Sequence, residues 1–194
     1  METDTKALLA AAAGGDQAAW DTLVQRHSSL LWSIARSFRL SRGAAADAVQ
    51  TTWLRLVENL DRIAEPDRLA GWLATTVRRE CLLTIRRAGR EHRAGGEELV
   101  IDLPDPAPPV DDRVLREERN AVLWQALGRL GEKCQQLLRV LMASPPPAYQ
   151  EVSAALGMPV GSIGPTRQRC LAQLRELVGA DPLLDPRQPE RGRA

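Results

Sequence analysis

The chain has 194 residues, a formal net charge of +1 and only 4% aromatic residues, among them five tryptophans. This length allows one or two small domains, and a hydrophobic content of 44% is typical of a globular protein in water. Alanine and leucine dominate, and no segment alternates as a β-strand does, so helices are favoured over sheets. The expected fold class is all-α.

The charge is distributed unevenly along the chain. Residues 78–93 hold six Arg against two Glu, and residues 97–118 hold eight Asp or Glu against two Arg. Residues 164–175 hold three Arg and no acid. This segregation indicates two polyanion-binding surfaces joined by an acidic connector, although solvated helix faces would give the same charge pattern.

Cys81, Cys134 and Cys170 lie far apart, each in an apolar helical pattern. Without a CxxC motif or a Cys/His cluster, the spacing supports neither a zinc site nor a disulfide framework, and it predicts buried free thiols in a reducing cytosol. His27 and His92 are isolated, so no metal, cofactor or catalytic constellation is expected. The N-terminal segment lacks a basic region and a bilayer-length apolar run. We expect a cytoplasmic protein, without membrane contact, that is not itself an enzyme.

Residues 1–93 are predicted to form a first domain of helices separated by short breaks. A short helix covers residues 5–13, Asp16 caps the next one, and a further helix covers residues 28–38. The clearest amphipathic helix covers residues 44–60. Its buried stripe consists of Val49, Trp53, Leu56 and Leu60, and its opposite side carries Asp47, Gln50, Thr51, Leu54 and Glu58.

A loop over residues 62–69 follows, since Pro66 forbids a continuous helix. A long helix then begins at Ala70. Its apolar side is expected to consist of Leu73, Val77, Cys81 or Leu82, and Ile85, with arginines on the remaining faces. Trp20, Trp32, Trp53 and Trp124 are assigned to the core, whereas Trp72 fits either the core or a surface that lines a bound strand.

Residues 94–113 are predicted to be an acidic linker, because four prolines within residues 104–109 rule out regular structure there. A second helical domain is expected over residues 114–179, and a disordered Pro-rich tail over residues 180–194. The predicted architecture is therefore two small helical domains joined by an acidic, proline-rich linker.

The second domain contains a helix-turn-helix pattern centred on Gly157. Glycine readily adopts the positive φ that sets the crossing of two such helices. A small residue, Ser153, stands four positions before Gly157. The apolar positions expected around the turn are occupied by Val152, Leu156, Met158 and Ile163.

The second helix of the motif is expected to have Ser162 as its N-cap and Pro165 at its third position, where no intrahelical N–H is needed. Gly164 would then let the backbone approach a phosphate. Arg169 or Gln168 would contact base edges in the major groove, and Arg167 and Arg175 would meet phosphates. The inward side would consist of Ile163, Cys170, Leu174 and Leu177. An ordinary helical hairpin with solvated arginines is the alternative.

In their order along the chain, these motifs resemble the bacterial sigma factors of the extracytoplasmic-function (ECF) group. ADAVQTTWLRLVENLD, residues 46–61, resembles the region 2.2 helix that docks on the β′ clamp helices of RNA polymerase. Residues 71–87 resemble regions 2.3 and 2.4, which open and read the −10 element, and residues 149–177 resemble region 4.2, which reads the −35 element. The resemblance implies only these two domains, without a region 1.1 or a folded region 3.

Three positions depart from the family's usual pattern. Gln50-Thr51 stands in place of Gln-Glu, and Val77-Arg78-Arg79 stands in place of Ala-Arg-Asn. Gly164-Pro165-Thr166 replaces the common Lys/Arg-Ser-Arg, so reading of the −35 element should depend less on charge at the helix tip.

The resemblance implies three groups of site residues. The polymerase-docking group is Asp47, Gln50, Thr51, Leu54 and Glu58. The −10 group, which would catch a flipped base and hold the single strand, is Arg62, Glu65, Asp67, Arg68, Trp72, Arg78, Arg79, Arg86 and Arg87. The −35 group is Ser162, Gly164, Pro165, Thr166, Arg167, Gln168 and Arg169.

The implied partners are core RNA polymerase, through its β′ clamp helices and β flap, promoter DNA and a possible anti-sigma factor. The linker would either thread the RNA path of the polymerase or act only as a solubilising tether. The residues alone leave two other classes of protein open, a helix-turn-helix regulator that never binds polymerase and a helical adaptor that binds only protein. Charge reversal on the docking helix, and at Arg167 and Arg169, would separate these classes.

Overall fold

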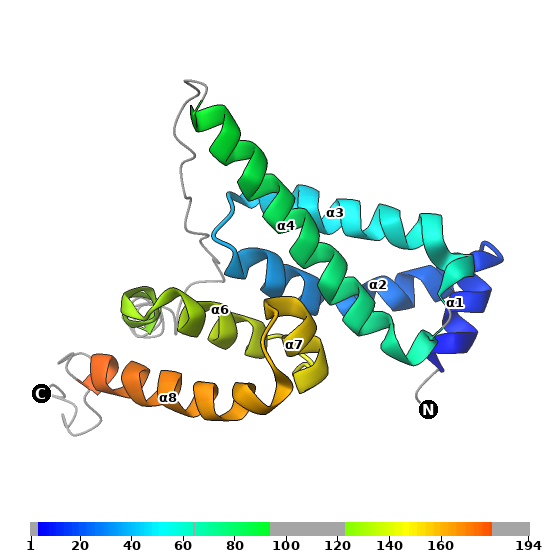
Figure 1. Ribbon diagram of the computed structural model, residues 1–194. Coiled ribbons are helices and arrows are strands. Elements are labelled where there is room, and N and C mark those ends of the chain that lie inside the picture. Colours follow the sequence, from blue (N-terminus) through cyan, green and yellow to red (C-terminus); the bar gives the residue numbers. More distant parts are fainter. Residues whose placement is uncertain (1–3, 64, 94–122, 180–194) are drawn as a thin grey trace, which may run out of the picture.

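The computed structural model describes residues 4–63, 65–93 and 123–179, and the regular structure in these ranges is all helical (Figure 1). The first block contains α1 (Thr5–Ala13), α2 (Gln17–Ser37), α3 (Arg42–Asn59), two 3₁₀ turns, η1 (Leu60–Arg62) and η2 (Pro66–Arg68), and α4 (Leu69–Arg93). The second block contains a helical segment over residues 123–129, α6 (Glu132–Leu141), α7 (Tyr149–Leu156) and α8 (Val160–Gly179). The predicted linker, residues 94–113, and tail, residues 180–194, lie outside the described residues.

Side-chain caps fix where the first helices begin. The Asp16 carboxylate accepts hydrogen bonds from the backbone N–H groups of Ala18 and Ala19 at 2.9 and 3.2 Å, so the predicted cap is confirmed. The predicted separate helix over residues 28–38 is wrong, because α2 continues without a break. The Ser28 hydroxyl donates to the Val24 carbonyl within the helix, at 2.6 Å, and one buried apolar stripe runs through the whole element.

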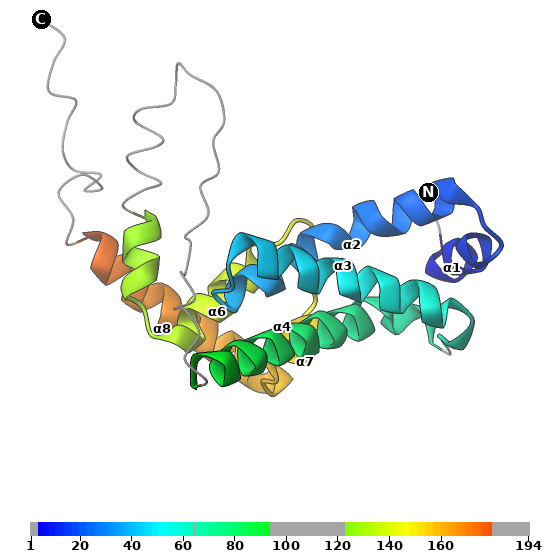
Figure 2. The same cartoon turned by 90° about the horizontal axis from the view of Figure 1, so that it is seen from above.

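The two blocks share one hydrophobic core. Leu23, Ile34 and Val77 of the first block are fully buried in it. From the second block, the same core contains Leu137, Val140, Val152, Ala155 and Ile163, all at 0% exposure. α6 packs against α2 and α7 packs against α4, as both views of the ribbon show (Figures 1 and 2).

Two hydrogen bonds also join the blocks. The backbone N–H of Ser144 donates to the Ser29 hydroxyl at 2.9 Å, and the Arg39 guanidinium donates to the Gln135 side-chain oxygen at 2.7 Å. Gln135 is buried, and its amide group donates in turn to the carbonyls of Gly128 and Leu130. The contact between the blocks is therefore both apolar and specifically hydrogen-bonded.

A second, smaller core lies within the second block. It joins residues 123–129, α6 and α8, and its buried members are Leu127, Leu130, Leu138 and Cys170. Cys134, Leu171, Leu174 and Leu177 pack against it while partly exposed. Because this core is small, the second block depends on the first for much of its apolar burial.

The structure corrects two core predictions. Ile85 is 41% exposed, although Leu73, Val77 and Cys81 of the same stripe are buried. The C-terminal end of α4 extends beyond the helices it packs against, and the burial of its apolar stripe decreases toward that end (Figure 1). Trp124 is 42% exposed, with the Arg139 guanidinium stacked over its ring at 5.4 Å.

The other three tryptophans assigned to the core are half-buried and pack against it. The rings of Trp20 and Trp53 meet edge to face, with centroids 5.9 Å apart, which links α2 to α3. The Trp32 ring carries the Arg36 guanidinium at 5.5 Å.

The expectation of three free thiols is wrong for two of them. Cys134 of α6 and Cys170 of α8 form a disulfide with their Cα atoms 5.3 Å apart. The two residues are separated by 36 positions, and nothing in that spacing indicates that α6 and α8 cross there. Cys81 is free and buried, as predicted, and burial raises the pKa of its thiol to about 12.

The buried histidine of α2 should make stability depend on pH. Burial, with a smaller effect from the Arg26 charge, lowers the pKa of His27 from 6.5 to about 4. A folded-state pKa below the unfolded value means that stability is present above about pH 6.5 and is lost as the pH falls toward 4. We expect the parent to lose about 2–3 kcal/mol more than a His27→Gln variant between pH 7 and 4.5 in urea unfolding. Equal losses would contradict the burial of a neutral imidazole.

Candidate nucleic-acid and docking interfaces

The outer side of α3 forms a continuous exposed face. Asp47, Gln50, Leu54 and Glu58 are exposed and Thr51 is half-buried, so the structure brings the whole predicted docking group together. Leu54 is 56% exposed and its neighbour Val57, which the sequence analysis missed, is 52% exposed. These are two large apolar side chains in an otherwise polar setting, an arrangement that is typical of a binding surface.

The predicted loop between α3 and α4 contains the short 3₁₀ turn η2, and η1 ends at the first residue of that loop. Arg62, Glu65, Asp67 and Arg68 are all exposed, and Glu65 pairs with Arg68 at 2.8 Å. The loop forms one wall of a cavity of about 760 Å³, and Glu65, Pro66, Asp67 and Arg68 line it. Arg62 does not.

The opposite wall of this cavity comes from α1, which sequence reasoning did not connect with the site. Lys6, Leu9, Ala10 and Ala13 line it. A helix of nine residues that is mainly Ala and Leu gives no signal of a binding role, and only its packing against η1 and η2 shows it.

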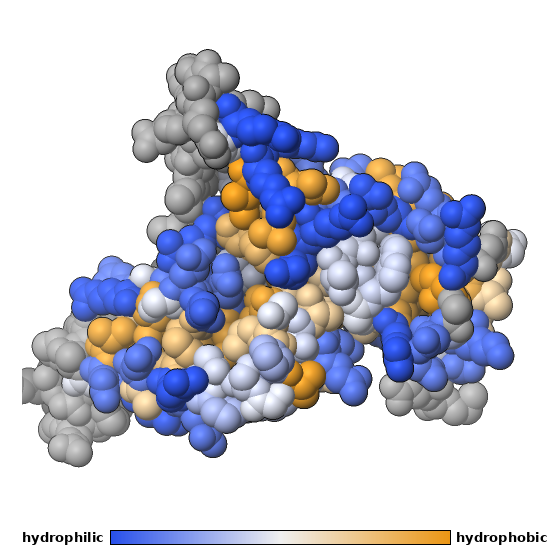
Figure 3. Space-filling view, in the orientation of Figure 1, coloured by the Kyte–Doolittle hydropathy of each residue, from blue (hydrophilic) through white to orange (hydrophobic). Residues whose placement is uncertain are grey.

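The arginines of α4 fall into two groups. Arg79, Arg86 and Arg87 are exposed, and Figure 3 shows hydrophilic surface beside an apolar patch along the upper part of α4. Arg78 is half-buried, and its guanidinium lies against the turn of the helix-turn-helix, where a Cβ on Gly157 would stand 2.9 Å from its Nη2. Trp72 is half-buried and packs on the shared core, which favours the core role that the sequence left open.

The turn of the helix-turn-helix has the predicted geometry. Gly157 ends α7 with φ at 67°, in the left-handed region, and its N–H donates to the Ser153 carbonyl at 2.8 Å. The Ser153 hydroxyl donates across the turn to the Met158 carbonyl at 2.6 Å. Val152 and Ile163 are fully buried on either side of the turn, so the predicted pattern is confirmed.

The start of the second helix was predicted incorrectly. α8 begins at Val160, and Ser162 lies inside its first turn with its hydroxyl donating to the Pro159 carbonyl at 2.7 Å. Pro165 therefore falls inside the helix and removes the bond that the Gly161 carbonyl would accept. Gly161 is exposed, so solvent can satisfy that carbonyl.

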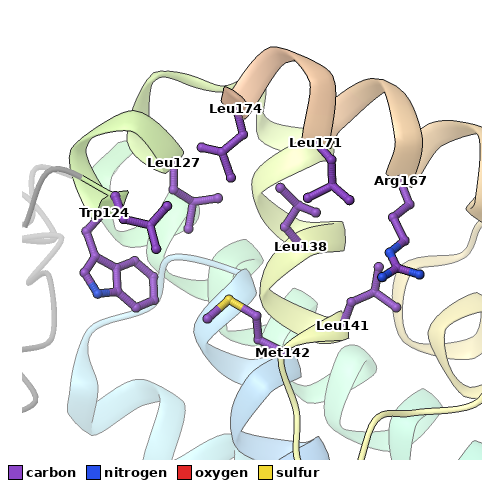
Figure 4. Close-up of a pocket in the computed structure, with 9 residues that line it drawn as sticks. Trp124, Leu127, Leu138, Leu141, Met142, Arg167, Leu171 and Leu174 are labelled. Carbon is purple, nitrogen blue, oxygen red and sulfur yellow. The ribbon is translucent and has the colours of Figure 1, made fainter. Parts of the chain in front are cut away.

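The outer side of α8 carries the predicted polar set. Pro165, Arg167, Gln168 and Arg169 are exposed and Thr166 is half-buried, with an Arg169 Nη2 to Thr166 Oγ1 distance of 3.3 Å. Arg167 also borders an apolar groove of about 190 Å³ (Figure 4). The other residues that line the groove are Leu123, Trp124, Leu127, Leu138, Leu141, Met142, Leu171 and Leu174.

Gly164 gives a testable case. It is half-buried inside α8, and apart from its two chain neighbours and the backbone of its own helix a Cβ there would meet the Tyr149 ring, at 4.0 Å, an ordinary contact distance. We expect Gly164→Ala to raise the free energy of unfolding by about 0.5–1 kcal/mol, because glycine is unfavourable inside a helix. Urea unfolding measures this, and a lower stability would show that α8 needs the glycine for another reason.

Among residues 4–63, 65–93 and 123–179, no three His, Cys, Asp or Glu side chains gather in a group that could hold a metal ion. In the same ranges, no helix combines the length and the apolar character that crossing a membrane requires.

Residues 23–91 match the family described as Sigma-70 region 2. Over 188 residues the chain is 30% identical to the RNA polymerase sigma factor CnrH of Cupriavidus metallidurans, and the match covers 93% of this chain and 97% of CnrH. The chain belongs to the ECF group of the sigma-70 family. It is also 29% identical, over 86% of its length, to the ECF RNA polymerase sigma factor SigE of Mycolicibacterium smegmatis, of which it spans 65%.

Solved structures place this ECF sigma factor among similar folds. CnrH in complex with the cytosolic domain of CnrY matches 92% of this chain, and 99% of the CnrH chain, at 25% identity with a TM-score of 0.58. RpoE of Bartonella quintana in complex with the anti-sigma factor NepR matches 84% of this chain and 98% of that chain at 22% identity, with a TM-score of 0.61, which indicates a shared fold. The match to Sigma-70 region 2 ends at residue 91. The similarity of the second block to sigma factors is therefore shown by the relatives that match over most of the chain.

Proposed function

We propose that this ECF sigma factor acts in the cytoplasm, where it binds core RNA polymerase and directs it to promoters with −35 and −10 elements. One observation supports this proposal most strongly. A single chain of this family contains two separate arginine-bearing helices, α4 and α8, together with an exposed docking face on α3. The factor supplies promoter recognition and DNA melting, and the polymerase is the enzyme.

The docking face on α3 is the contact with the β′ clamp helices. Leu54 and Val57 are the apolar anchors, and Asp47, Gln50 and Glu58 surround them with polar groups. Apolar anchors within a polar rim are the usual source of affinity and specificity in such interfaces. The ion pair between Arg55 and Glu80, at 2.8 Å, ties α3 to α4 and helps to keep this face rigid.

The cavity between α1 and the loop takes an unstacked base of the −10 element. Its wall mixes apolar residues with Glu65, Asp67 and Lys6, so a flat base can be both packed and hydrogen-bonded there. Arg79, Arg86 and Arg87 on α4 hold phosphates of the single strand. Such contacts depend strongly on salt, because each neutralised phosphate releases counterions.

Arg78 is released for a phosphate contact when the helix-turn-helix leaves α4, because its half-buried guanidinium lies against the turn at Gly157. The two blocks therefore act as separate domains on DNA, approximately residues 1–93 and 114–179. The packed arrangement is then a resting form of the free protein.

The outer side of α8 enters the major groove at the −35 element. Gln168 and Arg169 are exposed there and have the donor groups that read base edges, while Arg167 and Arg175 meet phosphates. The apolar groove that adjoins this side of α8, bordered by Arg167, is the candidate contact for the β flap, since an exposed apolar groove fits an apolar protein segment (Figure 4).

Run-off transcription tests the proposal directly. Purified core polymerase is incubated with a genomic fragment library, with and without this protein, and the new transcript starts are mapped. Discrete new starts that share two upstream motifs are expected. DNA binding by the protein alone, without new starts, would favour a helix-turn-helix regulator that does not bind polymerase.

A further inference from the structure

The disulfide between Cys134 and Cys170 lies at the anchor of the recognition helix. Cys170 is on the inner side of α8, directly after Arg169, which the proposed function assigns to DNA. Cys134 is on α6, and the bond crosses the small second core. It is therefore a covalent tie between the helix that reads the −35 element and the helix that packs on the first block.

The two cysteine residues differ in their exposure to solvent. Cys170 is 0% exposed, whereas Cys134 is partly exposed, with its sulfur 3.8 Å from the Gln173 side-chain oxygen. A reagent from solution therefore reaches Cys134 more readily than Cys170. Cys81 is fully buried in the shared core, and the raised pKa of its thiol keeps it protonated and unreactive.

We propose that Cys134 and Cys170 form a redox site that reacts with low-molecular-weight disulfides such as glutathione disulfide, and that this reaction sets how firmly α8 is attached to α6. The structure shows the oxidised state of the pair. The consequence for −35 recognition rests on the proposed function, whereas the chemistry and the attachment of α8 do not.

Two exchange steps account for the oxidation. The Cys134 thiol loses its proton, and the thiolate attacks one sulfur of glutathione disulfide, which forms a mixed disulfide and releases one glutathione thiolate. The Cys170 thiol then loses its proton and attacks the Cys134 sulfur, which forms the protein disulfide and releases the second glutathione. Two protein thiols are oxidised, one glutathione disulfide is reduced to two glutathiones, and excess glutathione reverses both steps.

Reduction should loosen α8 more than any other described helix. Without the bond, the attachment of this part of α8 to α6 depends on the small second core, which also borders an open apolar groove. The core that remains there contains only three other buried side chains, Leu127, Leu130 and Leu138. Ile163 still holds the beginning of α8 in the shared core, so the loosening is expected from Cys170 onward.

The experiment equilibrates the full chain in glutathione buffers of graded redox ratio. Free thiols are trapped by alkylation and counted by mass spectrometry, and hydrogen–deuterium exchange is measured at both extremes. We expect a two-electron transition and exchange in residues 170–179 that is at least about tenfold faster in the reduced protein, with α3 and α4 unchanged. Cys81→Ser is the matched control and should leave both results unchanged.

Two variants test the order of reaction. Cys170→Ser should accumulate one mixed disulfide on Cys134 quickly, whereas in Cys134→Ser the inward-facing Cys170 should take up glutathione more slowly, because α8 must first loosen to expose it. A pair that stays reduced across the glutathione series, or equal exchange of α8 in the two states, would overturn the proposal. Run-off transcription with the oxidised and the reduced protein measures the effect on promoter use. If neither state supported transcription, that result would count against the proposed function and not against the redox site.

Discussion

Replacing Asp47 and Gln50 with arginine is expected to remove binding to core RNA polymerase while leaving the fold intact. Both side chains are exposed on α3 and take no part in the core, and arginine is a good helix former. The change adds two positive charges and removes one negative charge beside Leu54, where the proposed interface must exclude water. We expect the dissociation constant for core polymerase to rise at least about 30-fold, which corresponds to about 2 kcal/mol.

The matched control places the same substitutions on another exposed helix face. Asp21 and Gln25 are exposed on α2, and Asp21→Arg with Gln25→Arg makes the same change in charge. Fluorescence anisotropy with labelled protein measures both affinities, and circular dichroism confirms that both variants are folded. If the α3 variant bound polymerase as tightly as the α2 control, the docking assignment would be wrong.

The features that could be predicted from the sequence are local ones. Asp16 caps α2 and Gly157 closes the turn with a positive φ, because each depends on a few neighbouring residues. The exposed side of α3 likewise follows from helical periodicity. Local patterns therefore identified most helices and placed most of the candidate site residues on their surfaces.

The wrong predictions have two causes. Either a local sequence signal favoured another structure, or the contact that decides the structure involves residues far apart along the chain. Gly161, Gly164 and Pro165 disfavour a helix, so its predicted start was too late, yet α8 begins at Val160 because Ile163 is held in the shared core. Tertiary burial outweighs weak propensity here.

Three further features depend on residues far apart along the chain. Gly157 lies against Arg78, Cys134 is bonded to Cys170, and Lys6 faces the loop before α4. A single sequence contains no periodicity that reports such contacts. These contacts bear most on regulation. Each one joins a helix or loop that is proposed to contact DNA to another element of the fold.

Tying the two blocks together in their packed arrangement is expected to abolish initiation. The Ser144 N–H and the Ser29 hydroxyl are 2.9 Å apart, so Ser29→Cys with Ser144→Cys places two thiols at the contact of the blocks. A disulfide there tethers the segment before α7 to α2, so the turn at Gly157 stays against the Arg78 guanidinium. Run-off transcription by the oxidised double variant should fall at least about tenfold, a barrier increase of about 1.4 kcal/mol or more.

Binding to core polymerase separates this effect from a loss of docking. The α3 face is exposed in the packed arrangement, so the cross-linked protein should bind polymerase with the affinity of the parent yet fail to open promoters. The two single variants and the parent, taken through the same oxidation and reduction, control for the bond between Cys134 and Cys170. Transcription at the parental rate by the cross-linked protein would mean that the −10 element is opened without Arg78, and that the packed arrangement is itself competent for initiation.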